Sequence, residues 1–289
     1  MKTLFNLFLT LRGRLIFLSC LATFPAMLFI FYLAEKERSF TFQNMEEEAE
    51  HLATLAAREH SYQFGGAQTL LKWMGEKLLE NRAISQFRFD EGFLTTLLVG
   101  HPHLANIGVL SKDGDVISSA YPLSNFPNLS DNPAVKRALN SKEIEAGSYV
   151  ISPIVGRPVL NLAYAVRDPG GTIYRIVFSG IDLQWLTKLA KQVDIPKDYI
   201  LLIVDRDGRI LTHSGFQDEG IFKMGEKISE LSNLSMHGSG KIIKLVDSKK
   251  KFFLLLKPMP GVPGVFVVSG LPYDRIYEKV NRTFFRILG

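Results

Sequence analysis

The chain has 289 residues, of which 46% are hydrophobic and 22% are charged, so it is long enough for one or two packed domains. Its net charge of +5 comes from the two ends, residues 1–34 and 281–289, which carry basic residues and no acid. Elsewhere 29 Lys and Arg match 29 Asp and Glu, so we expect no nucleic-acid partner. The one cysteine, Cys20, lies in an apolar run, which excludes a disulfide framework and a paired-cysteine metal site.

Residues 15–34 form an uncharged apolar segment. They read LIFLSCLATFPAMLFIFYLA, and a helix of this length spans about 30 Å, the thickness of a bilayer core. Its bulky end favours an uncleaved anchor over a cleaved signal peptide. Basic residues before the segment predict a cytoplasmic start. We therefore expect residues 1–34 to be a cytoplasmic stub and a transmembrane helix of the inner membrane, with the body periplasmic.

Residues 35–82 predict a long helix. Small and apolar residues recur at helical spacing: Met45, Ala49, Leu52 and Ala56, then Ala67, Leu71, Met74 and Leu78. Gly65-Gly66 interrupts this pattern at about 1 kcal/mol per glycine, which predicts a bend or a register shift. The stripe suits packing within the chain or against a second copy, and a homodimer is expected.

The next elements predict a small α/β module. A short helix over residues 93–99 precedes a hairpin over residues 106–120, which turns at Asp113-Gly114. After a loop rich in Gly, Pro and Asn, Asp131 is expected to cap a short helix over residues 133–139.

A β-meander follows. The runs 148–155, 158–167 and 172–179 are rich in β-branched and aromatic residues, and Gly and Pro turns separate them. Asp182 then stands before a segment with helical spacing of leucines, where it is a plausible N-cap.

Residues 191–273 repeat this plan. Residues 203–211 align with residues 109–117 at an offset of 94, and residues 267–271 align with residues 177–181 at an offset of 90. The alignment predicts a second sheet built in the same order as the first.

The second copy differs in detail. Strands are expected over residues 241–246 and 251–258, but no equivalent of the helix 133–139 is evident. Asp205-Arg206-Asp207-Gly208 resembles the start of a calcium loop, yet the later acidic ligands are missing, so we interpret it as a hairpin turn. Residues 274–289 predict a closing helix and the start of a second transmembrane segment.

The order of these features resembles the extracytoplasmic sensor domains called double Cache, which have PAS-like sheets. The segments that carry the resemblance are Asp131-Asn132-Pro133, Gly156-Arg157-Pro158-Val159 and Ser179-Gly180-Ile181-Asp182-Leu183. It implies an α+β fold in which a transmembrane helix and a long helix precede two antiparallel-sheet modules, a membrane-distal one over 83–190 and a membrane-proximal one over 191–273. It also implies a cytoplasmic output domain of the histidine kinase, diguanylate cyclase or chemoreceptor type. That domain is absent from this chain, so we expect a truncated chain.

Catalytic motifs are missing. The sequence has no P-loop, no GxSxG, no HExxH and no GxGxxG, so we expect neither an enzyme nor a cofactor. His101-Pro102-His103 is the best metal candidate, but two imidazoles do not complete a zinc shell, and no metal site is expected.

Five residues are candidates for ligand binding: Tyr121, Tyr149, Asn161, Arg175 and Asp182. Asn161 and Arg175 interrupt apolar strands and would suit a small carboxylate or another small anion, although each could instead pair within the protein. The resemblance implies that Asp182 matches an amine-binding acid, which competes with its capping role. Residues 132–135 lack the cation and the aromatic ring that amino-acid-sensing relatives carry, so an α-amino acid is not expected.

Two hypotheses follow. The first is a small-ligand sensing and transmembrane signalling module of a bacterial receptor, in which the ligand shifts an equilibrium between two arrangements of the distal module. The alternative is a membrane-anchored periplasmic module for protein interaction or dimerisation that binds no small ligand.

Overall fold

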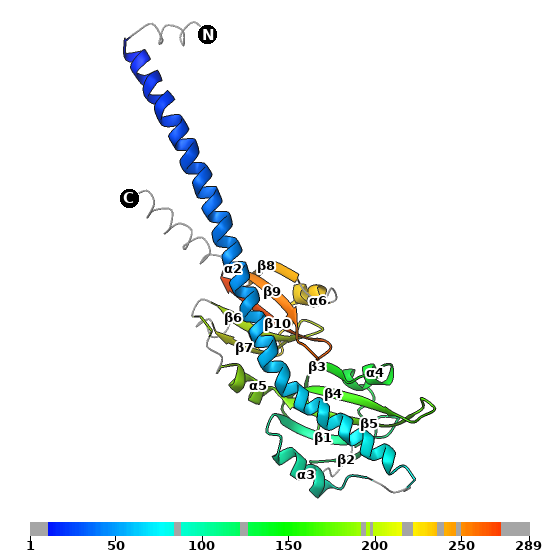
Figure 1. The fold of residues 1–289 in the computed structure, drawn as a ribbon. Coiled ribbons are helices and arrows are strands. Elements are labelled where there is room, and N and C mark those ends of the chain that lie inside the picture. The colour runs from blue at the N-terminus through cyan, green and yellow to red at the C-terminus, as the bar shows by residue number, and fades with distance from the viewer. Residues whose placement is uncertain are drawn as a thin grey trace. The chain divides into compact units, whose positions relative to one another are not determined.

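A computed structural model describes residues 11–83, 88–121, 127–191, 195–196, 199–215, 222–235, 240–246 and 250–272 (Figure 1). The chain divides into two compact units, Met1–Glu47 with Asp274–Gly289, and Glu48–Tyr273. Both sheets belong to the second unit. The closing helix and second membrane segment expected over 274–289 lie outside the described residues.

The long helix α2 (Leu11–Glu80) is unbroken. Gly65 and Gly66 continue it, and buried residues keep helical spacing on both sides, so the expected register shift is wrong, whereas the expected bend stays a prediction. Their neighbours Phe64 and Ala67 are buried, and this packing outweighs the helix-propensity loss of about 1 kcal/mol per glycine.

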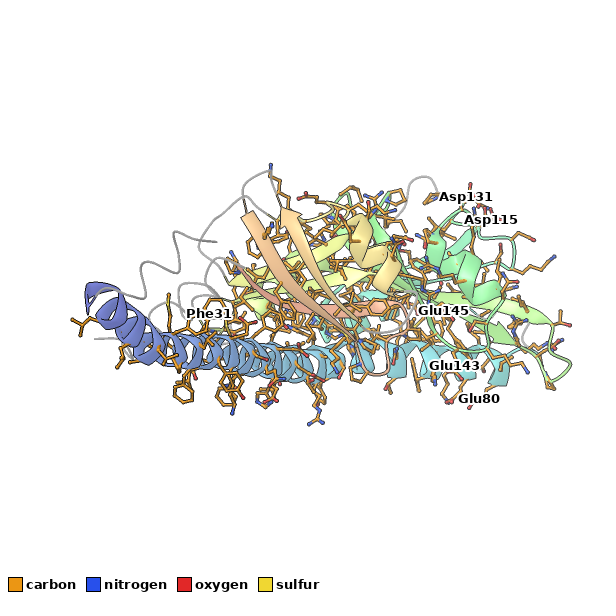
Figure 2. The ribbon with its side chains drawn as sticks, turned by 90° about the horizontal axis from the view of Figure 1, so that it is seen from above. Phe31, Glu80, Asp115, Asp131, Glu143 and Glu145 are labelled. Atoms are coloured by element: carbon orange, nitrogen blue, oxygen red, sulfur yellow. The ribbon has the colours of Figure 1, made fainter. Side chains whose placement is uncertain are left out.

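The first part of α2 carries exposed apolar side chains. Met27 is 72% exposed and Phe31 is 76% exposed (Figure 2). No helix among the described residues is both long enough and apolar enough to cross a membrane, so the transmembrane helix expected over residues 15–34 stays a prediction.

The first sheet has five antiparallel strands in the order β2-β1-β5-β4-β3. Its strands are β1 (Leu104–Leu110), β2 (Val116–Ser119), β3 (Glu145–Ile151), β4 (Pro158–Arg167) and β5 (Ile173–Asp182). Its helices are α3 (Glu91–Val99), α4 (Pro133–Leu139) and α5 (Leu183–Ala190). The hairpin, the meander and the short helices predicted from the sequence are confirmed.

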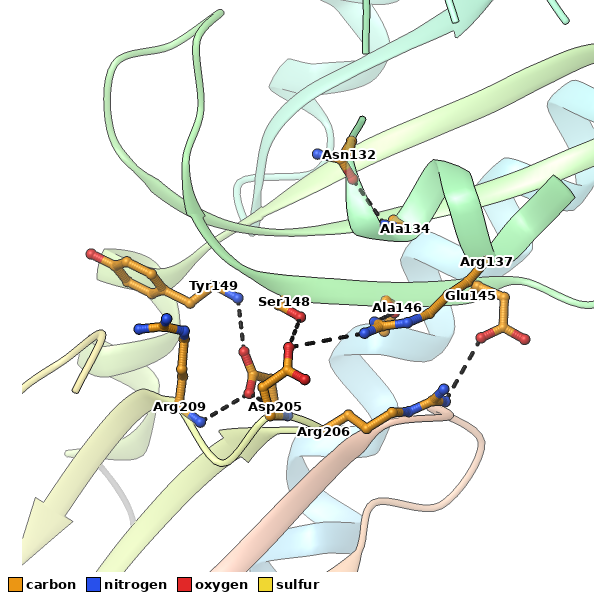
Figure 3. A network of polar contacts seen from close by, with 11 residues as sticks. Asn132, Ala134, Arg137, Glu145, Ala146, Ser148, Tyr149, Asp205, Arg206 and Arg209 are labelled. Carbon is orange, nitrogen blue, oxygen red and sulfur yellow. Dashed lines mark hydrogen bonds and ion pairs between the residues drawn. The ribbon is translucent and has the colours of Figure 1, made fainter. Parts of the chain in front are cut away.

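The cap of α4 differs from the prediction. Asn132 Oδ1 accepts the N–H of Ala134 at 3.0 Å (Figure 3), whereas the side chain of Asp131 is 97% exposed (Figure 2) and pairs with Lys136 at 2.8 Å. The prediction that Asp131 is the cap is wrong. Pro133 occupies the first helical position, and the capping residue is the one immediately before it.

The second sheet repeats the order of the first, as β7-β6-β10-β9-β8. Its elements are β6 (Ile200–Asp205), β7 (Ile210–Gly215), α6 (Ser229–Ser235), β8 (Gly240–Val246), β9 (Lys250–Pro258) and β10 (Val265–Pro272). The repeated plan predicted from the sequence is therefore confirmed.

Helix α6 is the equivalent of α4 that the sequence did not reveal. The N–H of Leu129, before α4, donates to the carbonyl of Gly114 at 2.8 Å, and the N–H of Ile228, before α6, donates to Gly208 at 2.8 Å. The second copy therefore has an equivalent of this helix, although none is obvious in its sequence. The α6 sequence SELSNLS has no N-terminal proline and few apolar residues, so it gave no helix signal.

The two faces of the first sheet pack differently. Tyr164 and Val166 of β4 pack against Gly75 of α2, and we call this side of the sheet the α2 face. Ala163 and Ala165 belong to a buried cluster that includes three residues of α4, and this side is called the α4 face. Because side chains alternate between the two faces along a strand, one set of β4 residues packs against α2 and the other against α4.

Candidate functional site

Polar residues meet on the α4 face near one end of the first sheet. Gly180 of β5 pairs with Asn106 of β1 on one side and with Asn161 of β4 on the other. Both amides therefore flank a position without a side chain. A Cβ at Gly180 would lie 3.4 Å from Asn161 Oδ1, so this amide oxygen borders the open position. We call Asn106, Gly180 and Asn161 the asparagine row.

The two amides of the row differ in their bonding. Asn106 is buried; its Oδ1 accepts the N–H of Ile107 at 2.8 Å, and its amide contacts Ser119 Oγ at 3.0 Å. Asn161 is half-buried, and the structure gives its side chain no hydrogen bond to any described residue. Asn106 is thus held in place, whereas the donors and the acceptor of Asn161 are unpaired among the described residues.

Asp182 continues the α4 face beyond the row. Its Oδ1 accepts the N–H groups of Gln184 at 2.9 Å and Trp185 at 3.2 Å, so the predicted N-cap role is confirmed. Its Oδ2 pairs with Arg157 at 3.2 Å. The carboxylate therefore already has backbone and charged partners, and Arg157 places a cation beside the row.

Tyr121 borders a cleft of about 250 Å³ at the outer edge of β2. The cleft is lined by Arg88, Phe89, Asp90, Glu91, Ile117, Ser118, Ser119 and Tyr121. Ser119 also contacts Asn106, so the cleft adjoins the asparagine row. The Oγ of Ser118 is buried and has no hydrogen-bond partner among the described residues.

Arg175 lies on the opposite face from Asn161. It pairs with Val166, and β4 and β5 keep one register from Val159 to Val166. Arg175 therefore belongs to the α2 face, where its guanidinium lies 4.7 Å from the ring centre of Tyr174. The structure does not bring Arg175 together with Asn161.

Tyr149 lies where the first sheet meets the second. Its ring packs against Gly225, whose Cβ position is 2.9 Å from Tyr149 Cζ, and its N–H donates to Asp205 at 2.9 Å. Of the five predicted residues, Asn161 and Asp182 share the α4 face, Tyr121 borders it, and Tyr149 and Arg175 lie elsewhere.

Two histidines of the sequence motif have structural partners. His101 Nδ1 lies 2.7 Å from the carbonyl of Leu97, and the ring of His103 packs on Trp185 at 5.6 Å. Burial lowers the pKa of His103, and His101 lowers it further. Within the described residues no group of three His, Cys, Asp or Glu side chains is placed to hold a metal ion.

Sequence reasoning missed Asn106 and Ser119. The signal for Asn106 was the same as for Asn161, a single amide within an apolar strand. Ser119 gave no such signal, because serine is common near strand ends. Only the register of β1 with β5 and β2 places both beside the row.

Comparison with curated sequences finds a partial relative. No family model matches this sequence. The chain is 22% identical over 203 residues to sporulation kinase D of Bacillus subtilis (strain 168), and the alignment covers 70% of this chain and 39% of that protein. The chain thus spans well under half the length of this curated relative.

Solved structures share the fold. The extracellular domain of the candidate histidine kinase rpHK1S-Z16 matches with a TM-score of 0.66 at 15% identity, over 82% of this chain and 98% of that domain. The ligand-binding domain of the Pseudomonas aeruginosa PAO1 amino acid chemoreceptor PctB, in complex with L-Arg, matches with a TM-score of 0.61 at 17% identity. This match covers 81% of this chain and 98% of that domain. The ligand-binding domain of the Pseudomonas fluorescens chemoreceptor CtaA, in complex with L-isoleucine, matches with a TM-score of 0.61 at 16% identity. This match covers 84% of this chain and 98% of that domain. The fold resemblance predicted from the sequence is confirmed.

Proposed function

We propose that this chain is the sensing part of a bacterial receptor and that it binds a small polar ligand over the asparagine row. The observation that carries this proposal is the amide of Asn161, which is half-buried on an apolar sheet and borders the open position at Gly180. A polar group in such a place normally has a partner, and a ligand would supply it. The ligand-binding domains of PctB and CtaA, which share the fold, support the same use.

The chemistry of the site favours a small ligand with donors and acceptors, such as a carboxylate or another small anion. Amide groups donate and accept, and the guanidinium of Arg157, which pairs with Asp182 at 3.2 Å, is the cation nearest to the row in place of Arg175. The clamp of an α-amino acid is not available at the start of α4. Asn132 is used as the helix cap, and Ala134 and Val135 are buried in the core.

The first prediction concerns Asn161→Leu. In a thermal-unfolding screen of small acids, amines and sugars, we expect at least one compound to stabilise the full chain. At 100 times its Kd, the compound should add about 2.7 kcal/mol. Asn161→Leu keeps the side-chain volume and removes the amide, so it should weaken binding about tenfold or more.

Arg175→Gln is the matched control, because Arg175 lies on the same sheet but on the opposite face. It should bind the compound as the unchanged chain does. A ligand response that survives Asn161→Leu and disappears in Arg175→Gln would place the site on the α2 face and contradict the proposal. A screen without any stabilising compound would favour the alternative of an interaction module.

We further propose that residues 15–34 anchor the chain in the inner membrane, that the body is periplasmic and that two copies associate along α2. The uncharged sequence of residues 15–34 supports the anchor. The stripe with Ala49, Leu71 and Met74 is buried within the chain, so a second copy would meet the exposed Leu55 and Tyr62 instead.

A cysteine at position 62 tests both statements together. In a Cys20→Ser background, Tyr62→Cys should form a disulfide-linked dimer in isolated membranes, and the dimer should resist alkaline extraction. Glu76→Cys, exposed elsewhere on α2, is the control and should cross-link less. A Tyr62→Cys chain that stays monomeric would contradict the dimer, and release of the chain by alkali would contradict the anchor.

A further inference from the structure

The two sheets contain the same turn with one chemical difference. In the first sheet, Ser111 Oγ accepts the N–H groups of Asp113 at 3.2 Å and Asp115 at 3.1 Å. In the second, Asp205 Oδ1 accepts the N–H groups of Asp207 and Arg209, each at 2.9 Å. One oxygen therefore closes the turn in each copy.

Asp205 has a second oxygen that Ser111 lacks. Its Oδ2 accepts the N–H of Tyr149, from β3 of the other sheet, at 2.9 Å (Figure 3). The side chain is fully buried, and burial raises the pKa of Asp205 while the three N–H donors oppose that rise. A hydroxyl closes the equivalent turn without burying an acid, so the extra oxygen accounts for the contact between sheets.

The local shape of β3 makes this contact possible. β3 is an edge strand, so its outward N–H groups have no ladder partner. Its register with β4 shifts between Ala146 and Tyr149, which is a β-bulge. The bulge lies where the strand meets the second sheet, and it turns Ser148 and Tyr149 toward the Asp205 turn.

Further contacts join the same two segments. The hydroxyl of Ser148 donates to Asp207 Oδ2, and Arg206 lies 3.9 Å from Glu145 Oε2 (Figure 3). Arg137 of α4 donates to the carbonyl of Ala146 at 2.7 Å and lies 4.0 Å from Asp207. Helix α4 is therefore tied to the second sheet both directly and through β3.

We propose that the bulge of β3 and the turn Asp205–Arg209 form a coupling joint that transmits changes in α4 and β3 to the second sheet. As a signalling route this rests on the proposed function, because α4 and β3 flank the asparagine row. The mechanical coupling itself needs no ligand, so an experiment can contradict the coupling joint without contradicting the ligand site, and the reverse. A buried carboxylate with a donor from each sheet makes separation of the sheets unfavourable.

The test uses hydrogen exchange of the full chain, read by peptide mass spectrometry. Ala138→Gly perturbs α4, far from the second sheet in sequence. With the joint intact, it should speed exchange in β9 and β10 by about fivefold or more, which is the coupling expected within one network. In the Asp205→Ser background, which keeps the turn closed as Ser111 does, Ala138→Gly should change that exchange by less than about twofold.

Two variants control for effects on folding. Ser111→Asp places the same acid in the equivalent turn of the first sheet. In this background Ala138→Gly should still speed exchange in β9 and β10. Ser148→Ala removes one contact of the joint and should reduce transmission even if Asp205→Ser does not fold. The proposal would be overturned if Ala138→Gly speeds exchange in β9 and β10 equally in the unchanged, Asp205→Ser and Ser148→Ala backgrounds. It would also be overturned if Ala138→Gly does not change this exchange in the otherwise unchanged chain.

Discussion

Lowering the pH from 7.5 to 5 is expected to destabilise the protein by about 2 kcal/mol through His60 alone, and His60→Leu is expected to remove this loss. The His60 side chain is fully buried in α2, and neither ring nitrogen has a hydrogen-bond partner among the described residues. Burial lowers the pKa of His60 to about 4 from an ordinary value of 6.5. The native state therefore excludes a proton that the unfolded chain accepts.

The sign of the effect follows from this difference. Above pH 6.5 both states leave His60 neutral, so its contribution to stability is fully present. As the pH falls from 6.5 toward 4, the unfolded chain gains the proton first, and stability decreases by about 1.4 kcal/mol per pH unit. Below pH 4 both states are protonated, and the loss reaches its limit of about 3 kcal/mol.

Urea unfolding of the full chain at pH 7.5 and pH 5 measures the effect. His51→Leu is the matched control, because His51 is exposed on the same helix, and it should keep the pH dependence of the unchanged chain. Some dependence will remain in His60→Leu, since burial also lowers the pKa of His103 and of His213. A His60→Leu chain with the full loss at pH 5 would contradict this assignment.

Gly208→Ala is expected to destabilise the second sheet by about 3 kcal/mol or more. Gly208 has a φ of +73°, and a Cβ there would lie 2.4 Å from the carbonyl oxygen of Ile228. The conformation alone costs an alanine about 1 to 2 kcal/mol. The contact adds to this, because the backbone before α6 would have to move.

Gly261→Ala separates the two contributions. Gly261 also has a φ of +73°, but no atom lies within 4 Å of its Cβ position. It should therefore show only the conformational cost of about 1 to 2 kcal/mol, and the difference between the variants should measure the contact. Equal loss of stability in both variants, measured by urea unfolding, would show that the contact at Ile228 contributes nothing.

Local patterns in the sequence predicted most of the fold. Asp113-Gly114 predicted the first hairpin, and the offset of 94 residues predicted the second sheet, because turn chemistry and strand alternation are local properties. Helix α6 was missed because it has only seven residues, with two leucines and no N-terminal proline. The cap of α4 was misplaced by one residue, since Asp131 and Asn132 are both good capping residues and only the start of the helix separates them.

The site depended on non-local information. Asn161 and Arg175 gave the same signal, a polar residue in an apolar strand, yet they lie on opposite faces of the sheet. Their relation is set by the register of β4 with β5, which a single strand does not contain. The alignment of Ser111 with Asp205 likewise gave no indication that β3 supplies a donor to one of them.

The most direct test of the account is a crystal structure of the full chain with the most strongly stabilising compound of the screen. The account predicts that the compound lies on the α4 face over Gly180, with a hydrogen bond to the amide of Asn161. A compound bound on the α2 face beside Arg175, or against the second sheet, would contradict the central claim.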